Sequence, residues 1–379
     1  MGKQRGTGRA VRMAMVFSAA FAAAGLANTK EQADPATEEF RLPGMTIVGS
    51  EERIGELTGS GQRIALDGLS RQSYGDVNRV LRQAPGVYLR EEEGYGLFPN
   101  ISIRGIDPSR SSKTTLMEDG VLTAPAPYSA PSAYYSPNAA RMSGLEVLKG
   151  SSQIRFGPHI TGGAVNYLST PIPASRKGYL RTLYGSENEW RAHLYYGDTL
   201  RLDNGGRFGY LVEGFYRRTD GFKKLDRAPD AKGSGTGFEL MEPMLKLMWE
   251  PNTAVYQRFE ARVGYTDLDA DETHLGLTEE DFARDPYRRY AASRFDNFSS
   301  EQFRSYVRHF VAFSDATDLE TTFYYNRFDR NWYRLSDVQN AGMAPNFGAP
   351  VETSRGMAAT LARGGAGTWP CCAARSRAS

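Results

Sequence analysis

Cysteine and histidine, the residues that most often hold metals or carry redox chemistry, are scarce in this chain. Its 379 residues include four histidines, which lie far apart, and two cysteines, Cys371 and Cys372, which are adjacent. Adjacent cysteines make neither a disulfide framework nor a CxxC site, and no two histidines have the i, i+4 spacing of a metal-binding helix. We therefore predict no catalytic residue, no protein-bound metal and no cofactor.

The chain also has little net charge. Its 46 lysines and arginines nearly balance its 44 aspartates and glutamates, and the basic residues are scattered along the sequence. Nucleic acid is therefore not an expected partner. A secreted β-rich enzyme is disfavoured as well, because the sequence has no nucleophile elbow, P-loop or metal-ligand spacing.

Long apolar runs are absent except at the N-terminus, which has the pattern of a secretory signal peptide. Four basic residues precede an apolar run over residues 13–26, and small residues end that run. The run is shorter than the roughly 20 residues that a membrane-spanning helix needs. We predict a signal peptide over residues 1–27, and any membrane insertion of the remaining chain must use strands.

Residues 28–57 form a polar leader with one short β-prone run. Met45, Thr46, Ile47 and Val48 stand between two glycines, far from any other strand signal. An isolated run of this kind can add as a strand to the sheet edge of a partner protein.

Residues 58–173 combine a short helix with several short strands. Val77, Val80 and Leu81 have the i, i+3, i+4 spacing of one apolar helical face, which Pro85 and Gly86 close. Strand candidates cover residues 87–90, 101–104, 114–117 and 145–148, separated by glycine, proline and serine. The pattern predicts a compact α+β domain.

Residues 174–350 carry longer strand-like segments, rich in aromatic residues and arginine. We predict seven strands, over residues 178–186, 190–199, 207–219, 238–250, 256–268, 303–314 and 319–330. In the fifth, Phe259 and Val263 share one face and Arg258 and Arg262 the other, as in a membrane barrel with a wet lumen. A soluble sandwich also alternates, but here short and long connections alternate too, as they do in outer-membrane barrels.

Four segments carry a family resemblance: residues 81–90 (LRQAPGVYLR), 100–107 (NISIRGID), 144–150 (GLEVLKG) and 162–166 (GGAVN). Together they resemble the plug of a TonB-dependent outer-membrane receptor. Residues 107–110, 116–120, 126–131 and 276–282 are most similar to the ferric citrate type. The resemblance implies an α+β plug domain followed by the first strands of an antiparallel transmembrane β-barrel, which has 22 strands in the intact family.

The resemblance also implies a function and partners. Such a receptor takes a ferric siderophore or ferric citrate across the outer membrane of a Gram-negative bacterium, with iron carried as the chelated substrate. The proton-motive force drives uptake through TonB of the TonB–ExbB–ExbD complex, and outer-membrane lipid surrounds the barrel. Alternatives are a receptor for a non-iron ligand, such as cobalamin, nickel or a glycan, and a soluble periplasmic plug fragment that only binds TonB.

Site residues follow from the matching positions. Residues 45–49 resemble the TonB box, with the first plug strand as the alternative: Met45, Thr46, Ile47, Val48 and Gly49. Arg104 and Gly105 match the plug strand whose arginine is expected to meet barrel carboxylates, with a purely structural ion pair as the alternative.

Substrate contacts are expected from arginine forks and hydroxyl donors, because a ferric citrate complex is an anion with many oxygens. The candidates are two tyrosines near the plug apex and four arginines of the longest loop: Tyr95, Tyr128, Arg284, Arg288, Arg289 and Arg294. The same loop is rich in carboxylates, which alternatively solvate it or bind a cation.

The sequence departs from the family pattern in its strand count. About seven strands leave open sheet edges, and each unpaired backbone group in hydrocarbon costs several kcal/mol. Residues 351–379 are rich in alanine, glycine and arginine and read as an atypical tail, with the composition of an out-of-frame segment. We therefore expect a truncated receptor gene product, which a search for a receptor-like reading frame downstream would test.

Overall fold

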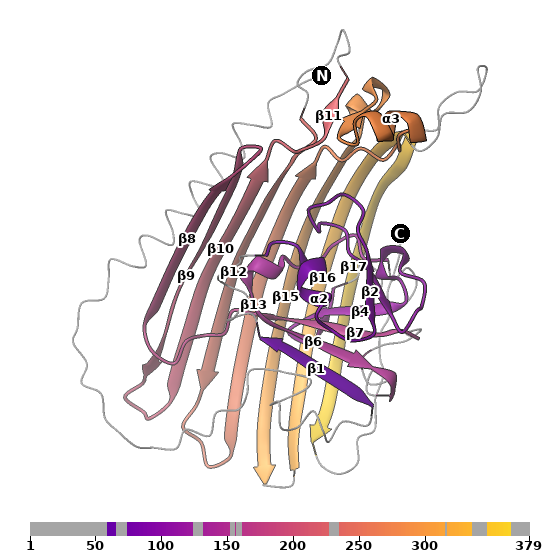
Figure 1. Cartoon of the computed structure of the whole chain (residues 1–379). Helices are drawn as coiled ribbons and strands as arrows, with labels where there is room; N and C mark the ends of the chain where they lie inside the picture. The colour runs from indigo at the N-terminus through magenta and orange to yellow at the C-terminus, as the bar shows by residue number, and fades with distance from the viewer. Residues whose placement is uncertain are drawn as a thin grey trace.

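The computed structural model describes residues 59–65, 74–123, 132–151, 156, 161–226, 235–314, 317–335 and 347–364, the last of these as backbone only. The predicted signal peptide, the TonB box and Tyr128 lie outside these ranges and stay predictions. The described residues form a small α+β plug and a long antiparallel sheet, and the plug packs against one face of that sheet (Figure 1). The expected fold, a plug followed by barrel strands, is confirmed.

The plug is built on a five-stranded sheet with the order β1-β6-β7-β4-β5. Neighbours are antiparallel except β4 and β7. A separate hairpin pairs β2 with β3. The strands of both are β1 (Ser60–Ala65), β2 (Val87–Arg90), β3 (Asn100–Ile103), β4 (Thr114–Glu118), β5 (Val121–Leu122), β6 (Met142–Lys149) and β7 (Gly163–Ser169).

The predicted plug helix is α2 (Val77–Leu81). Asp76 caps it by accepting the Asn78 N–H at 2.8 Å, which satisfies one of the free amides of the first turn. Val77, Val80 and Leu81 are fully buried against the plug strands, as their spacing predicts. The described part of the plug also has two short 3₁₀ turns, η2 (Ser109–Ser111) and η3 (Ala139–Arg141).

The long sheet has the order β17-β16-β15-β13-β12-β10-β9-β8, with every pair antiparallel. This is one strand more than the seven expected. The strands are β8 (Lys177–Gly185), β9 (Glu189–Arg201), β10 (Arg207–Thr219), β12 (Phe238–Glu250), β13 (Tyr256–Ala270), β15 (Asn297–Ser314), β16 (Thr317–Leu335) and β17 (Phe347–Gly364).

The predicted bounds of β10 and β12 match the structure, whereas β15 begins six residues before the predicted start. The apolar–polar alternation is interrupted there by three polar residues, Ser299, Ser300 and Glu301. Their backbone nevertheless pairs with β13 and β16. The eighth strand, β17, pairs with β16 and carries the sheet past residue 350 into the stretch predicted as a tail.

The two faces of the sheet differ in polarity. On β13 the outward side chain of Val263 is 44% exposed, whereas the inward side chain of Arg262 is 4% exposed. The same outward face carries large apolar groups on most strands: Leu180, Tyr184, Trp190, Leu245, Trp249, Phe303, Val307 and Phe323. This confirms the apolar-out, polar-in pattern read from the sequence.

The connections at one end of the sheet are short (residues 202–206, 251–255 and 315–316). At the other end two connections are long, as predicted (residues 220–237 and 271–296), whereas the turn between β8 and β9 is short. We call the end with long connections the outer end; its loops hold β11 (Lys224–Leu225), α3 (Glu279–Arg284), β14 (Arg288–Arg289) and η5 (Ala291–Phe295). Among the helices that the structure describes, none has the length and apolarity of a membrane span.

Candidate functional site

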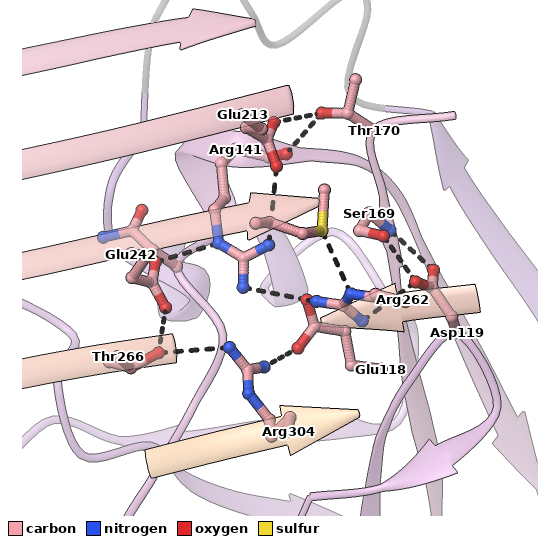
Figure 2. Close-up of polar contacts among 12 residues, drawn as sticks. Glu118, Asp119, Arg141, Ser169, Thr170, Glu213, Glu242, Arg262, Thr266 and Arg304 are labelled. Carbon is pink, nitrogen blue, oxygen red and sulfur yellow. Dashed lines mark hydrogen bonds and ion pairs between the residues drawn. The ribbon is translucent and has the colours of Figure 1, made fainter. Parts of the chain in front are cut away.

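A cluster of buried charges lies where the plug meets the inner face of the sheet (Figure 2). We call it the interface ion cluster. Its plug members come from the end of β4 and from η3, and its sheet members from β10, β12, β13 and β15: Glu118, Asp119, Arg141, Glu213, Glu242, Arg262 and Arg304. Their side chains are all at most 10% exposed.

The turn between β4 and β5 aims two carboxylates at the sheet. Asp119 and Gly120 both have left-handed φ angles, 51° and 78°, which reverse the chain directly after Glu118. The Asn166 side chain accepts the Gly120 N–H at 2.9 Å, and Asp119 accepts the Ser169 N–H at 2.9 Å. Strand β7 therefore fixes the turn, and the two acids reach the sheet from a rigid support.

Arg141 makes the plug's own cationic contribution. Its Nη2 donates to Glu118 Oε1 at 2.9 Å and its Nε to Glu242 Oε2 at 3.0 Å, while Nη1 lies 3.9 Å from Glu213 Oε2. Burial opposes the charge, but Glu242 and Glu213 outweigh it and hold the pKa of Arg141 above its ordinary value. One arginine thus joins a plug carboxylate to two strands of the sheet.

Cationic side chains of the sheet point toward the plug. Arg262 donates to Asp119 Oδ2 at 3.0 Å and also to Glu118, and Arg304 donates to the second oxygen of Glu118. Asp119 also lies 3.3 Å from Lys246 Nζ. Burial raises the pKa of Asp119, but Lys246 and Arg262 outweigh it and hold that pKa well below its usual range. The plug and the sheet therefore each contribute both carboxylates and cations to the ion pairs between them.

A second group of residues lies toward the outer end of the sheet. The Arg110 guanidinium carbon is 4.9 Å from the Phe98 ring centre and 5.0 Å from that of Trp332. Arg330 lies over Tyr134 at 3.5 Å and Arg334 over Trp332 at 3.9 Å, contacts that favour cations on aromatic faces. We call these residues the outer aromatic–arginine site: Phe98, Arg110, Tyr134, Arg330, Trp332 and Arg334.

Arg110 is the central cation of this outer site. Its Nη2 pairs with Glu92 at 2.5 Å, and its Nη1 is buried without a hydrogen-bond partner in the described part of the chain. Burial lowers the pKa of Arg110, and Glu92 acts in the opposite direction. A guanidinium with an unused donor on an aromatic floor suits an anion rich in oxygen atoms.

Arg104 and Gly105, the predicted contact between plug and barrel, follow β3 directly. Both have left-handed φ angles, 57° and 83°, so the chain turns away directly after β3. Arg104 is exposed, and its guanidinium lies beside Gly150 of the plug, so its contact with a barrel carboxylate stays a prediction. A contact of that kind is made by Arg141, which the sequence analysis did not name. This role of Arg141 was not predicted, because η3 has no strand pattern. Glu213 and Glu242 at inward positions of their strands were nevertheless a signal that a buried cation pairs with them.

Tyr95 docks one loop of the plug onto the sheet. Its hydroxyl accepts the Phe222 N–H at 3.0 Å, and its ring packs on Phe222 at 5.3 Å and Phe238 at 5.1 Å between ring centres. Burial raises the pKa of its hydroxyl. These contacts give Tyr95 a structural role, and its predicted contact with substrate stays a prediction.

The predicted loop arginines contact residues of the outer loops. On α3, Arg284 pairs with Glu280 at 2.7 Å in the i, i+4 arrangement. Arg288 pairs with Asp226 at 2.9 Å and with Asp281 at 2.8 Å. Arg289 donates to the Pro286 carbonyl at 2.9 Å, and Arg294 lies over the Phe295 ring at 4.4 Å. None of these contacts is with a residue of the outer aromatic–arginine site, so the substrate role of the four arginines stays a prediction.

Comparisons with known proteins agree with this architecture. The sequence model of the TonB-dependent receptor plug domain matches residues 53–164. The unliganded ferric citrate transporter FecA is 19% identical, with a TM-score of 0.59 over 86% of this chain and 52% of FecA. The ferric yersiniabactin uptake receptor FyuA from Yersinia pestis is 14% identical, with a TM-score of 0.61 over 83% and 46%.

A third similar structure is the copper transporter OprC, which is 18% identical, with a TM-score of 0.56 over 80% of this chain and 43% of OprC. The chain therefore spans about half the length of the solved proteins that it matches. It shares with them the fold of a plug and barrel strands.

Proposed function

We propose that this chain forms the plug and adjoining strands of a TonB-dependent receptor, which takes up a ferric siderophore or ferric citrate across the outer membrane. Transport is proposed for a closed barrel that contains these residues, because β8 and β17 are unpaired edges in the described sheet. The proton-motive force acting through TonB would drive uptake, with Met45 to Gly49 as the segment that TonB engages.

The interface ion cluster is the observation that carries this proposal. The plug packs apolar groups such as Phe98 on the sheet, and it is also held by buried ion pairs. These pairs join its Glu118, Asp119 and Arg141 to four strands of the sheet. Buried ion pairs add little net stability but fix one arrangement, and removing a single partner is costly. The cluster therefore suits a plug that must seat in one position in the lumen and still be released.

The outer aromatic–arginine site supports an anionic cargo. Three guanidinium groups gather there, and Glu92 is the carboxylate paired with Arg110. Guanidinium forks recognise carboxylate oxygens in two-point contacts, so citrate-type and other anionic chelates fit this chemistry. Similar structures are named for ferric citrate, ferric yersiniabactin and copper, which keeps a non-iron ligand as the alternative.

Growth on defined iron sources tests the proposal. A strain that lacks the gene, and the same strain carrying it, would be grown under iron limitation with one ferric chelate at a time. We expect gene-dependent growth on an anionic chelate and loss of that growth when TonB is absent. Equal growth of both strains on every ferric chelate would reject the iron assignment and direct the search to copper, cobalamin, nickel or glycans.

Membrane fractionation separates the receptor from a soluble periplasmic plug fragment. The outward face of the sheet exposes Leu180, Val263 and Phe323, which favours contact with lipid over contact with water. We therefore expect a heat-modifiable band in the outer-membrane fraction. Recovery of the protein only in the periplasmic fraction would favour the fragment.

A further inference from the structure

Asn100, the first residue of β3, is a polar residue with no exposed surface. Its backbone pairs with that of Arg90 across the β2–β3 hairpin, so Asn100 lies where the connection between these strands returns to the hairpin. We call this connection, residues 91–99, the apex loop. An asparagine amide has two donors and an acceptor, and Asn100 uses both kinds to contact residues at the outer aromatic–arginine site.

The donor side of Asn100 closes the apex loop. Its Nδ2 donates to the carbonyl oxygens of Arg90 and Phe98, at 3.3 Å each, and to Glu92 Oε2 at 3.0 Å. Arg90 precedes the loop, and Phe98 lies near its end. One side chain therefore fixes the path of the loop that brings the Phe98 ring to the Arg110 guanidinium.

The acceptor side of Asn100 holds the backbone of Arg110. Its Oδ1 accepts the Arg110 N–H at 2.8 Å, and the Arg110 carbonyl accepts the Ala133 N–H at 2.7 Å. Arg110 and Ser111 both have left-handed φ angles, 48° and 50°. Two successive non-glycine residues in this region are strained, because each Cβ crowds a backbone oxygen, and they persist only where neighbouring groups hold them.

The strained turn carries an arginine at a position where glycine would fit better. Glycine adopts left-handed φ angles without a steric cost, so a turn that only reversed the chain would be less strained with glycine at position 110. Strained backbone of this kind is concentrated at binding sites. The turn therefore indicates a role for the Arg110 side chain that a smaller residue would not fill.

Glu92 extends the hold of Asn100 to the Arg110 side chain. Glu92 Oε1 lies 2.5 Å from Arg110 Nη2, and Glu92 Oε2 accepts the hydrogen bond from Asn100. Arg110 Nη1 has no hydrogen-bond partner in the part of the chain that the structure describes. Asn100 therefore restrains Arg110 at its backbone and through the carboxylate beside its guanidinium, and Nη1 is the donor left for a carboxylate group of a ligand.

We propose that Asn100 is a positioning residue of the outer aromatic–arginine site, which orients the Arg110 guanidinium toward a carboxylate group of the anionic chelate. Asn100 has no exposed surface and acts through Arg110 rather than by touching the ligand. Its part in ligand binding rests on the proposed function, whereas its hold on the Arg110 backbone does not.

Hydrogen exchange of the full chain in detergent, read by mass spectrometry at single-residue resolution, tests this hold without any ligand. Asn100→Ala removes the acceptor of the Arg110 amide, which should then exchange about fivefold to tenfold faster. Asn100→Asp keeps an acceptor oxygen, so in that variant the Arg110 amide should stay protected. The Arg104 amide, which donates to the Gly86 carbonyl at 2.8 Å beyond the other end of β3, should exchange at the wild-type rate in both variants. Unchanged exchange of the Arg110 amide in Asn100→Ala would overturn the proposal.

Binding of ferric citrate tests the effect on the site. Asn100→Ala should weaken binding about tenfold in the wild-type chain but less than about twofold in an Arg110→Gln background, because that background lacks the arginine through which Asn100 acts. Equal losses in the two backgrounds would show that Asn100 acts elsewhere in the plug, and would overturn the proposal.

A matched control separates positioning from a general loss of plug stability. Thr123→Ala removes another buried polar side chain of the plug, whose hydroxyl donates to the Leu116 carbonyl at 3.1 Å. This variant should keep the wild-type affinity for ferric citrate, and a loss as large as that of Asn100→Ala would overturn the proposal. If the wild-type chain does not bind ferric citrate, the proposed function fails for this ligand, and exchange of the Arg110 amide still decides whether Asn100 holds the arginine.

Discussion

Arg141 of the plug and Glu242 of β12 lie 3.0 Å apart and face each other across the boundary between the plug and the sheet. Both side chains are almost fully buried, at 1% and 2% exposure. Arg141 also pairs with Glu118 of the plug, so one guanidinium group joins a carboxylate of the plug to a carboxylate of the sheet. The plug's position in the sheet therefore depends on this charge.

Removing Arg141 should strongly destabilise the seated plug. The substitution Arg141→Met removes the cation paired with buried Glu242 and one of the partners of Glu118 and Glu213, and breaking a buried pair in this way costs about 3–5 kcal/mol. Urea titration of the full chain in detergent measures the loss. The matched control is Arg82→Met, which removes an exposed pair with Glu91 and should change the free energy of unfolding little.

A double variant tests whether the cost comes from the orphaned carboxylates. Adding Glu242→Gln to Arg141→Met removes one of the unpaired charges, so the double variant should lose less than the sum of the single losses. We expect a coupling of about 1–3 kcal/mol between these positions. Additive losses would show that Arg141 stabilises the plug by packing alone.

The strand bounds could be predicted because alternation is local. Alternating apolar and polar side chains mark β10 and β12 within their own sequences, and the bounds of both strands were predicted to the residue. The partner of Glu242 could not be found in this way. Arg141 lies 101 residues away and meets it only because the plug turns its η3 toward the sheet.

The loop arginines illustrate the same limit. Their clustering in the sequence suggested a binding surface, but the pairing of β11 with β14 brings Asp226 to Arg288. That pairing joins two loops separated by two strands, so no pattern within either loop reveals it. Inward charges on Arg262 and Arg304, by contrast, were visible, and a plug of opposite charge could have been inferred from them.

The acid Asp119 should give the plug a pH-dependent stability. Because its pKa is depressed in the folded chain, its contribution is fully present above its ordinary pKa of 3.8 and is lost as the pH falls toward the folded value. We therefore expect Asp119→Asn to be less stable than the wild type by a constant amount from pH 5 to pH 8. That difference should shrink below about pH 4.

Urea titrations of both proteins across this pH range check the prediction. Glu279→Gln on the exposed helix α3 is a suitable control, since it removes one carboxylate outside the interface ion cluster. A difference between wild type and Asp119→Asn that does not change below pH 4 would contradict the assigned role of the Asp119 charge.

The apolar outward face should matter for membrane insertion. Val263→Lys places a charge on that face, where it costs about 2–4 kcal/mol near the bilayer midplane and less toward its surfaces. We expect a smaller outer-membrane fraction of this variant. Glu301→Lys, at a polar exposed position near the outer end of β15, should insert normally. Equal fractionation of both variants would favour the soluble plug fragment.

Binding of ferric citrate should depend on the arginines of the outer aromatic–arginine site and not on those of the long loop. Arg110→Gln removes the central cation of the outer aromatic–arginine site, and a lost charged hydrogen bond contributes about 1.5–3 kcal/mol, which corresponds to roughly tenfold or more in Kd. Titration of the full chain in detergent with ferric citrate, followed by tryptophan fluorescence, measures this change. Trp332 lies 5.0 Å from the Arg110 guanidinium and is placed to report on it.

The matched control is Arg284→Gln, because Arg284 is exposed and paired with Glu280 on α3. We expect its affinity for ferric citrate to equal that of the wild type. Thermal unfolding of each variant should accompany the titration, since Arg110 also packs on Phe98 and its loss can loosen the plug. A larger loss of affinity in Arg284→Gln than in Arg110→Gln, at equal thermal stability, would move the binding surface from the plug apex to the long loop.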